Sequence, residues 1–259
     1  MRVELHSGEL TLTGEVHEPL RSVDPDYGVI LCHGSTQMGR RYPLMQFLAS
    51  KLSAYHPVLA FDLPGFGSSP PLVVDSLDDY LMGRHLQAAT KFLWEEFGLD
   101  SVVVGHSMGG RVAIQGAVGD SRVKALALIA GLYLFPRDVN VVVRLLESFS
   151  RVVRAEWRIG FRELAEELVR REPQSRALSK LRKPLLAVQA GREQYDFIRR
   201  TQWDALRLAS GPACIAIMDD ANHSFHGKYE TVYEITHGWL RGTLNHDKWE
   251  CTSQARSIF

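Results

Sequence analysis

One short segment of the chain has the residue types and spacing of a serine nucleophile. Residues 102–110 are V-V-V-G-H-S-M-G-G, which contains G-x-S-x-G around Ser107. A serine acts as a nucleophile only when its Oγ is exposed beside a base, and a sharp turn from a strand into a helix exposes it. Such a turn strains the backbone, and the small residues Gly105 and Gly109 relieve the crowding. The positive end of the helix that follows favours developing negative charge. The segment therefore predicts covalent catalysis through Ser107.

That turn requires a buried strand before it and a helix after it, and both patterns recur along the chain. Short apolar runs without alternation are typical of strands that are buried on both faces. They occupy residues 28–32, 57–61, 101–104, 123–129, 184–188 and 213–217. Residues 5–16 alternate like two short antiparallel strands, and helical stripes cover residues 44–52, 77–93 and 232–239. Strand and helix alternate at least five times, which predicts an α/β fold. We expect a doubly wound, mostly parallel sheet of about eight strands.

One interval is too long for a simple crossover between two of these strands. About 50 residues separate the run that ends at Ile129 from the run that begins at Pro184, and they contain a helical apolar stripe from Val142 to Val153. We expect residues 1–259 to form a single domain, with a small helical cap inserted after the sixth strand at about 134–181. Residues 137–183 contain 12 basic and 7 acidic residues. This excess is typical of a solvated helical face with ion pairs, although a cap that attracts an anionic substrate is the alternative.

The composition of the chain argues against several classes of protein. Lys and Arg total 30 and Asp and Glu total 30, so the chain lacks the basic excess of nucleic-acid binders. We find no apolar run long enough to span a membrane, no signal peptide, and only three cysteines, so we expect a cytoplasmic protein. No metal-ligand cluster or phosphate-binding glycine loop is present, and we expect neither metal nor cofactor. A small-molecule substrate is the expected partner, and the oligomeric state is open between a monomer and a homodimer.

Four motifs in a fixed order suggest a family. His33-Gly34-Ser35 follows the third strand, and D-L-P-G-F-G-S at 62–68 follows the fourth. G-H-S-M-G-G at 105–110 comes next, and A-N-H-S-F at 221–225 follows the last strand. In these motifs and their spacing the sequence resembles the α/β-hydrolase family over nearly its whole length. The resemblance is specific for fold and much less so for substrate.

The resemblance implies a role for each matching residue. Ser107 would be the nucleophile, and His223 would be the general base that takes its proton and returns it to the leaving group. The backbone N–H groups of Met108 and Ser35 would form the oxyanion hole. Asp62 would organise its own turn rather than react.

Ten histidines compete for the role of base. His223 is favoured because it follows a strand in a small polar loop and precedes the last helix, where a loop can place an imidazole over the nucleophile. His226 is expected at a helix start on the surface. His106 is expected to pack beside the nucleophile, and His33 to hold the shape of its own loop.

Three carboxylates are candidates for the third member of the triad. The family places its acid shortly after the strand at 184–188, often an aspartate three positions after a glycine. If Ala190 takes the place of that glycine, Glu193 is the acid, whereas if Gly191 is that glycine the position holds a glutamine. We favour Glu193, with Asp196 as the alternative and Asp138 as a third option after the preceding strand. A carboxylate there would fix the tautomer of the histidine and stabilise the imidazolium.

These assignments predict a serine hydrolase that cleaves a carboxylic ester, thioester or lactone of a small to medium apolar substrate through an acyl-enzyme on Ser107. The same three residues on the same fold also support cleavage of carbon–carbon bonds, cyclisation or acyl transfer, and the motif does not separate these reactions. A ligand-binding relative without catalysis is the third hypothesis. The complete set of Ser107, His223 and a carboxylate argues against it.

Overall fold

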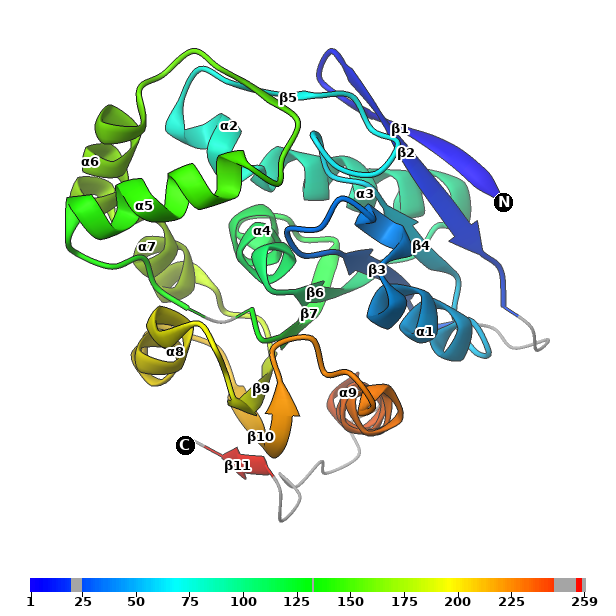
Figure 1. Cartoon of the computed structure of the whole chain (residues 1–259). Helices are drawn as coiled ribbons and strands as arrows, with labels where there is room; N and C mark the ends of the chain where they lie inside the picture. Colours follow the sequence, from blue (N-terminus) through cyan, green and yellow to red (C-terminus); the bar gives the residue numbers. More distant parts are fainter. Residues whose placement is uncertain (20–24, 132, 245–254, 258–259) are drawn as a thin grey trace.

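The computed structural model describes residues 1–19, 25–131, 133–244 and 255–257 (Figure 1). Its main sheet contains, in spatial order, β1 (Arg2–Ser7), β2 (Leu10–His17), β4 (Val58–Phe61), β3 (Gly28–Cys32), β6 (Ser101–His106), β7 (Val123–Ile129), β9 (Leu185–Arg192), β10 (Ala213–Asn222) and β11 (Ala255–Ser257). Strands β4 to β10 are mutually parallel, and β1, β2 and β11 pair antiparallel at the two edges. The prediction of a doubly wound, mostly parallel sheet is confirmed.

Helices cover both faces of the sheet, which explains why its strands are apolar without alternation. Two helices, α1 (Pro43–Leu52) and α9 (Tyr229–Leu244), lie on one face, and α3 (Gly83–Phe97), α4 (Met108–Ala117) and α8 (Asp196–Leu208) lie on the other (Figure 1). In β3, Val29 and Leu31 belong to the core under α1 and α9, whereas Ile30 and Cys32 belong to the opposite core. Every side chain of this strand is therefore buried.

The strand order reverses between β3 and β6, and this point locates the crevice of the fold. After β3 the chain continues to β4 on one side, and after β6 it continues to β7 on the other. Open α/β sheets bind ligands at the carboxyl ends of the strands where the order reverses. The loop that follows β3 and the turn that follows β6 therefore lie together at this crevice.

The long interval between β7 and β9 contains α5 (Val139–Ser150), β8 (Ala155–Trp157), α6 (Phe161–Arg171) and α7 (Pro173–Lys180). A short parallel pairing that we did not predict ties it to the body, because β8 pairs with β5 (Leu72–Val74). Beside this pair, the Arg154 guanidinium donates to the carbonyls of Phe66, Gly67 and Ser69. The insertion is thus held at its midpoint by the loop that follows β4.

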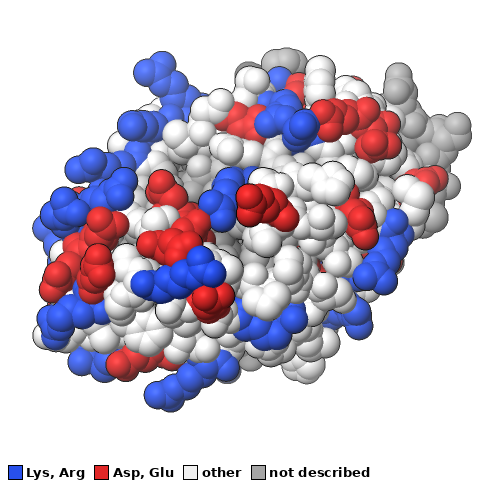
Figure 2. Space-filling model, turned by 90° about the horizontal axis from the view of Figure 1, so that it is seen from above, with Lys and Arg blue, Asp and Glu red and all other residues white. Residues whose placement is uncertain are grey.

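Several charged residues of the insertion form exposed pairs. Arg162 pairs with Glu166, Arg171 with Glu167, and all four side chains are at least partly exposed. Seen from above, Lys and Arg side chains alternate with Asp and Glu over this side of the molecule (Figure 2). These contacts agree with a solvated helical face.

The stripe at residues 77–93 is two helices rather than one. The short helix α2 (Leu77–Leu81) ends at Met82, whose φ of 60° breaks the helical path before α3 begins. A Cβ on Gly83 would lie 3.1 Å from the amide nitrogen of Gly116, so a residue without a side chain lets α3 start against α4. Periodicity alone does not reveal such a break.

Within the described ranges, no helix has the length and apolar character required to cross a membrane.

Candidate active site

The turn after β6 holds Ser107 in the strained conformation that its motif predicts. Ser107 has φ 51° and ψ −118°, a region that a residue with a side chain rarely occupies. Glycines at two close backbone approaches allow this turn to form. A Cβ on Gly105 would lie 2.6 Å from the Gly109 oxygen, and a Cβ on Gly109 would lie 2.0 Å from the Cys32 oxygen. Glycine at both positions lets the turn pass between β3 and α4 with the Ser107 side chain facing outward.

The loop after β10 brings His223 to this serine. Its Nε2 lies 3.0 Å from Ser107 Oγ. The loop is shaped by Asn222, whose side-chain oxygen accepts from the Ser224 N–H at 3.1 Å, and by the fully buried Phe225, which has a φ of 52°. The imidazole is 8% exposed, and the edge-to-face ring of Tyr195 covers it at 4.7 Å between centroids.

Glu193 is the acid that contacts the histidine. Its Oε2 accepts from His223 Nδ1 at 2.8 Å, and its Oε1 accepts from the Tyr195 N–H at 2.9 Å. Because Nδ1 carries the proton in this arrangement, Nε2 is left as the acceptor that faces Ser107. The structure places the other two candidates elsewhere. Asp196 is exposed at the start of α8 and pairs with two arginines of that helix, and Asp138 caps α5.

Two backbone amides beside Ser107 have no hydrogen-bond partner within the described ranges. Met108 is the first residue of α4, where N–H groups lack intrahelical partners, and Ser35 follows the close approach of Gly34 to the serine. A Cβ on Gly34 would lie 3.1 Å from the Ser107 Cβ. Within the described ranges, neither the Ser35 nor the Met108 N–H donates to another residue. Both residues line the cavity beside Ser107.

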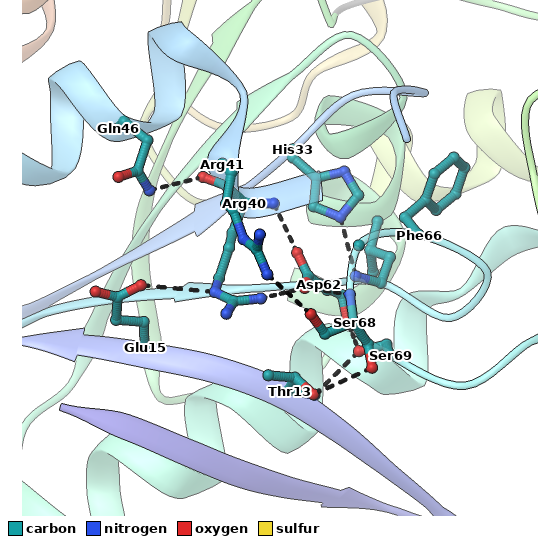
Figure 3. Close-up of polar contacts among 12 residues, drawn as sticks. Thr13, Glu15, His33, Arg40, Arg41, Gln46, Asp62, Phe66, Ser68 and Ser69 are labelled. Carbon is teal, nitrogen blue, oxygen red and sulfur yellow. Dashed lines mark hydrogen bonds and ion pairs between the residues drawn. The ribbon is translucent and has the colours of Figure 1, made fainter. Parts of the chain in front are cut away.

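Asp62 organises a buried hydrogen-bond network with Arg40 and with the turn that follows β4 (Figure 3). Its carboxylate accepts from the Arg40 N–H at 2.7 Å, from the Arg40 guanidinium and from the Ser68 N–H at 2.8 Å. His33 joins the same region, since Nε2 accepts from the Leu63 N–H at 3.0 Å while Nδ1 donates to the Gly34 carbonyl at 2.7 Å. This neutral imidazole, whose pKa is lowered by burial, holds the two loops together.

Comparison with known proteins now decides the family. The model of a family described as "Alpha/beta hydrolase family" matches residues 29–241, well over half of the chain. The chain belongs to the α/β-hydrolase family. No curated protein sequence matches significantly.

Many solved structures share the fold of this α/β-hydrolase. The esterase domain of a Rhodothermus marinus protein is 19% identical with a TM-score of 0.68, over 93% of this chain and 97% of that one. Est1E from Butyrivibrio proteoclasticus, with ferulic acid bound, is 14% identical with a TM-score of 0.71, over 94% and 99%. The dienelactone hydrolase of Anabaena variabilis is 19% identical with a TM-score of 0.64, over 94% and 97%. At these identities the likeness shows the fold.

A cavity of about 320 Å³ opens above Ser107. Its walls come from the α/β-hydrolase body and from the insertion, which contributes Phe135, Leu145, Ser148, Phe149 and Val152. Further aromatic side chains lie on α2, after β7 and at the start of α8. Such a cavity suits an apolar group of modest size that is held beside the serine.

The motifs describe two residues of the cavity lining incompletely or not at all. His106 was expected to pack, and it does, but its Nε2 also donates to the His223 carbonyl at 3.1 Å. Burial, followed by the charge of His223, lowers the pKa of His106 to about 3, so it stays neutral. Its place directly before Ser107 was the available signal. The second is Arg111, four residues after Ser107 on α4, which no motif pointed to.

In the described part of the chain, no three His, Cys, Asp or Glu side chains gather as a metal site requires.

Proposed function

We propose that this α/β-hydrolase is a serine hydrolase that cleaves a carboxylic ester, thioester or lactone of a small to medium apolar substrate. The observation that carries the proposal is the continuous hydrogen-bonded chain from Glu193 through His223 to Ser107 at the wall of an apolar cavity. Several proteins with this fold are named esterases, and one is named a dienelactone hydrolase, which supports ester-type bonds as the target.

The first half-reaction follows from the positions of the donors and acceptors. Ser107 Oγ attacks the carbonyl carbon while its proton passes to His223 Nε2. The carbonyl oxygen becomes an oxyanion, and the N–H groups of Ser35 and Met108 stabilise it together with the positive end of α4. His223 then gives the proton to the leaving oxygen or sulfur, whose bond to carbon breaks, and the acyl group stays on Ser107.

The second half-reaction returns the enzyme to its starting state. His223 Nε2 takes a proton from water, the oxygen of that water attacks the acyl carbon, and the proton returns to Ser107 Oγ as the acid leaves. Throughout, the carboxylate of Glu193 stabilises the imidazolium and keeps Nε2 facing the serine.

The insertion at about 134–181 serves as the cap of the active site in this proposal. Its residues Leu145 and Phe149 line the cavity that also holds the nucleophile. Since the fold hosts many substrates, the shape of this lining sets which acyl group fits.

The test is hydrolysis of p-nitrophenyl butyrate by the wild type and by Ser107→Ala. We expect kcat to fall at least about 10⁴-fold, since the triad acts as a unit. The matched control is Ser121→Ala, at an exposed turn before β7, the end of that strand away from the site, and it should keep wild-type kcat. Turnover by Ser107→Ala at more than a tenth of the wild-type rate would overturn the proposal.

A fluorophosphonate probe separates a hydrolase from a ligand-binding relative. An activated serine gives one adduct per chain on Ser107, and the adduct should be absent from Ser107→Ala. Hydrolysis in ¹⁸O-labelled water then puts the label in the released acid. Transfer to another acceptor or cyclisation would give products without the label. Hydrolytic cleavage of a carbon–carbon bond would also label the acid, and its second product would be a carbon leaving group in place of an alcohol or thiol.

A further inference from the structure

The cavity carries one permanent charge, and it lies deep in the wall. Among the described residues that line the cavity, Arg111 alone is an Arg, Lys, Asp or Glu. It is 2% exposed and lies on α4, one helical turn after Ser107. Because Met108 begins α4, Arg111 lies in the first turn of this helix, and both Ser107 and Arg111 line the same cavity.

The contacts of Arg111 leave its charge without a counter-ion. The guanidinium carbon lies 4.2 Å from the ring centroid of Tyr80 and 5.6 Å from that of Phe135. Nη2 donates to the Tyr80 carbonyl at 3.3 Å, and Nε has no hydrogen-bond partner. Within the described ranges, no carboxylate pairs with this guanidinium.

Arg40, a second buried arginine within the described ranges, shows what is missing around Arg111. Arg40 is 6% exposed, and its guanidinium pairs with the carboxylate of Asp62. A buried charge without such a partner is costly, and stacking on aromatic rings offsets only part of that cost. The cavity thus presents a planar cation whose free donors suit a carboxylate.

We propose that Arg111 binds a carboxylate on the acyl part of the substrate, so that the preferred substrates are half-esters of short dicarboxylic acids. This inference rests on the proposed function. The leaving group lies on the side of His223, at the end of β10, because His223 protonates it. The carboxylate therefore belongs to the acyl chain, which extends along α4 from Ser107 toward Arg111.

A second donor lies in the same part of the cavity. Tyr133 lines it, and burial raises the pKa of this tyrosine to about 12, although the nearby charge of Arg111 opposes the rise. The hydroxyl therefore stays protonated at neutral pH and can donate to an anion. No other described residue bonds to it.

The test compares two esters of the same shape. One is monomethyl glutarate, which ends in a carboxylate, and the other is its neutral primary amide, methyl 4-carbamoylbutanoate. We expect the wild type to favour the half-ester about ten- to a hundredfold in kcat/KM, the range of a charge-assisted hydrogen bond. Arg111→Met should reduce this ratio to about one, and Arg111→Lys should keep part of it. The control Arg207→Met, at an exposed position on α8, should keep the full ratio. A wild-type ratio of one or less, or a full ratio in Arg111→Met, would overturn the inference.

A binding measurement keeps this inference separate from the proposed reaction. Glutarate should bind Ser107→Ala in calorimetry, and glutaramide should not. Adding Arg111→Met should weaken glutarate binding at least tenfold, with far-UV circular dichroism as the check on folding. If glutarate binds through Arg111 while neither p-nitrophenyl butyrate nor monomethyl glutarate is hydrolysed, the proposed function is wrong and the anion site stands. If the butyrate ester is hydrolysed and glutarate does not bind, the anion site is wrong.

Discussion

The two oxygens of Glu193 have different partners, and this makes a substitution there informative. Oε2 faces His223 Nδ1, and Oε1 accepts from the Tyr195 N–H. Glu193→Gln keeps the size of the side chain and removes its charge. Because the Tyr195 N–H requires an oxygen, the new amide must turn its NH₂ group toward His223. The imidazole then accepts on Nδ1, carries its proton on Nε2, and no longer takes the proton of Ser107.

The expected loss follows from the tautomer and the missing charge together. Replacing the acid of a serine triad by its amide costs about 10⁴ in kcat. We expect a loss of about 10³- to 10⁴-fold here, or about 4–5.5 kcal/mol at 1.36 kcal/mol per tenfold. KM should change little, since Glu193 lies behind His223 and does not line the cavity.

The assay is kcat and KM for p-nitrophenyl butyrate. Asp196→Asn is the matched control, because that carboxylate is three residues along the chain, exposed, and paired with Arg199 and Arg200. It should stay within about twofold of the wild type. The reasoning fails if Glu193→Gln keeps more than a tenth of wild-type kcat, or if Asp196→Asn loses as much.

Two further predictions concern stability. Gly109→Ala would place a Cβ 2.0 Å from the Cys32 oxygen, so we expect the free energy of unfolding in urea to fall by more than about 3 kcal/mol. The control Gly160→Ala has open space around the new Cβ and should change this free energy by less than about 0.5 kcal/mol. Equal effects of the two variants would contradict the packing of the turn. The pKa of His106 is about 3 in the folded chain, against an ordinary value of 6.5. As the pH falls, the unfolded chain therefore takes up this proton before the folded chain does. The contribution of neutral His106 to the free energy of unfolding is full above pH 6.5 and decreases on acidification. This one group should remove about 2 kcal/mol between pH 7 and pH 5, and a His106→Gln variant with an unchanged pH dependence would refute it.

The parts of the fold that were predictable are those with a repeated local signal. Buried parallel strands are apolar on both faces, so Gly28–Cys32 and Val123–Ile129 could be bounded to the residue. The turn at Ser107 was predictable because its crowding admits almost only glycine on either side. The contact between Ser107 and His223 was expected from the order of the motifs, and the structure brings the two together.

The acid was harder to assign because its strand ends without an apolar signal. The expected strand stopped at Val188, but β9 continues to Arg192, and Arg192 pairs with Asn222 beyond a register shift in β10. Its last two residues are exposed, so composition does not reveal them as strand. That extension carries Glu193 to the level of His223 and leaves Asp196 to begin α8.

Pairings between distant segments, and the burial of single residues, leave no pattern in the sequence. The pairing of β5 with β8 joins three-residue strands about 80 positions apart, too short for alternation to mark them. Arg111 lies on a helix as one more polar residue in sequence. Its burial depends on the rings of Tyr80 and Phe135, which come from two other segments of the chain.

The tie between β5 and β8 separates the insertion into two parts with different freedom to vary. The residues of the insertion that reach the cavity, Phe135 and four residues between Leu145 and Val152, all precede β8, whereas α6 and α7 follow it. Substitutions in the segment before β8 can therefore change the shape of the pocket, while insertions and deletions after β8 fall outside its lining. The anchored backbone keeps each change local, so new specificities can arise without rebuilding the catalytic centre.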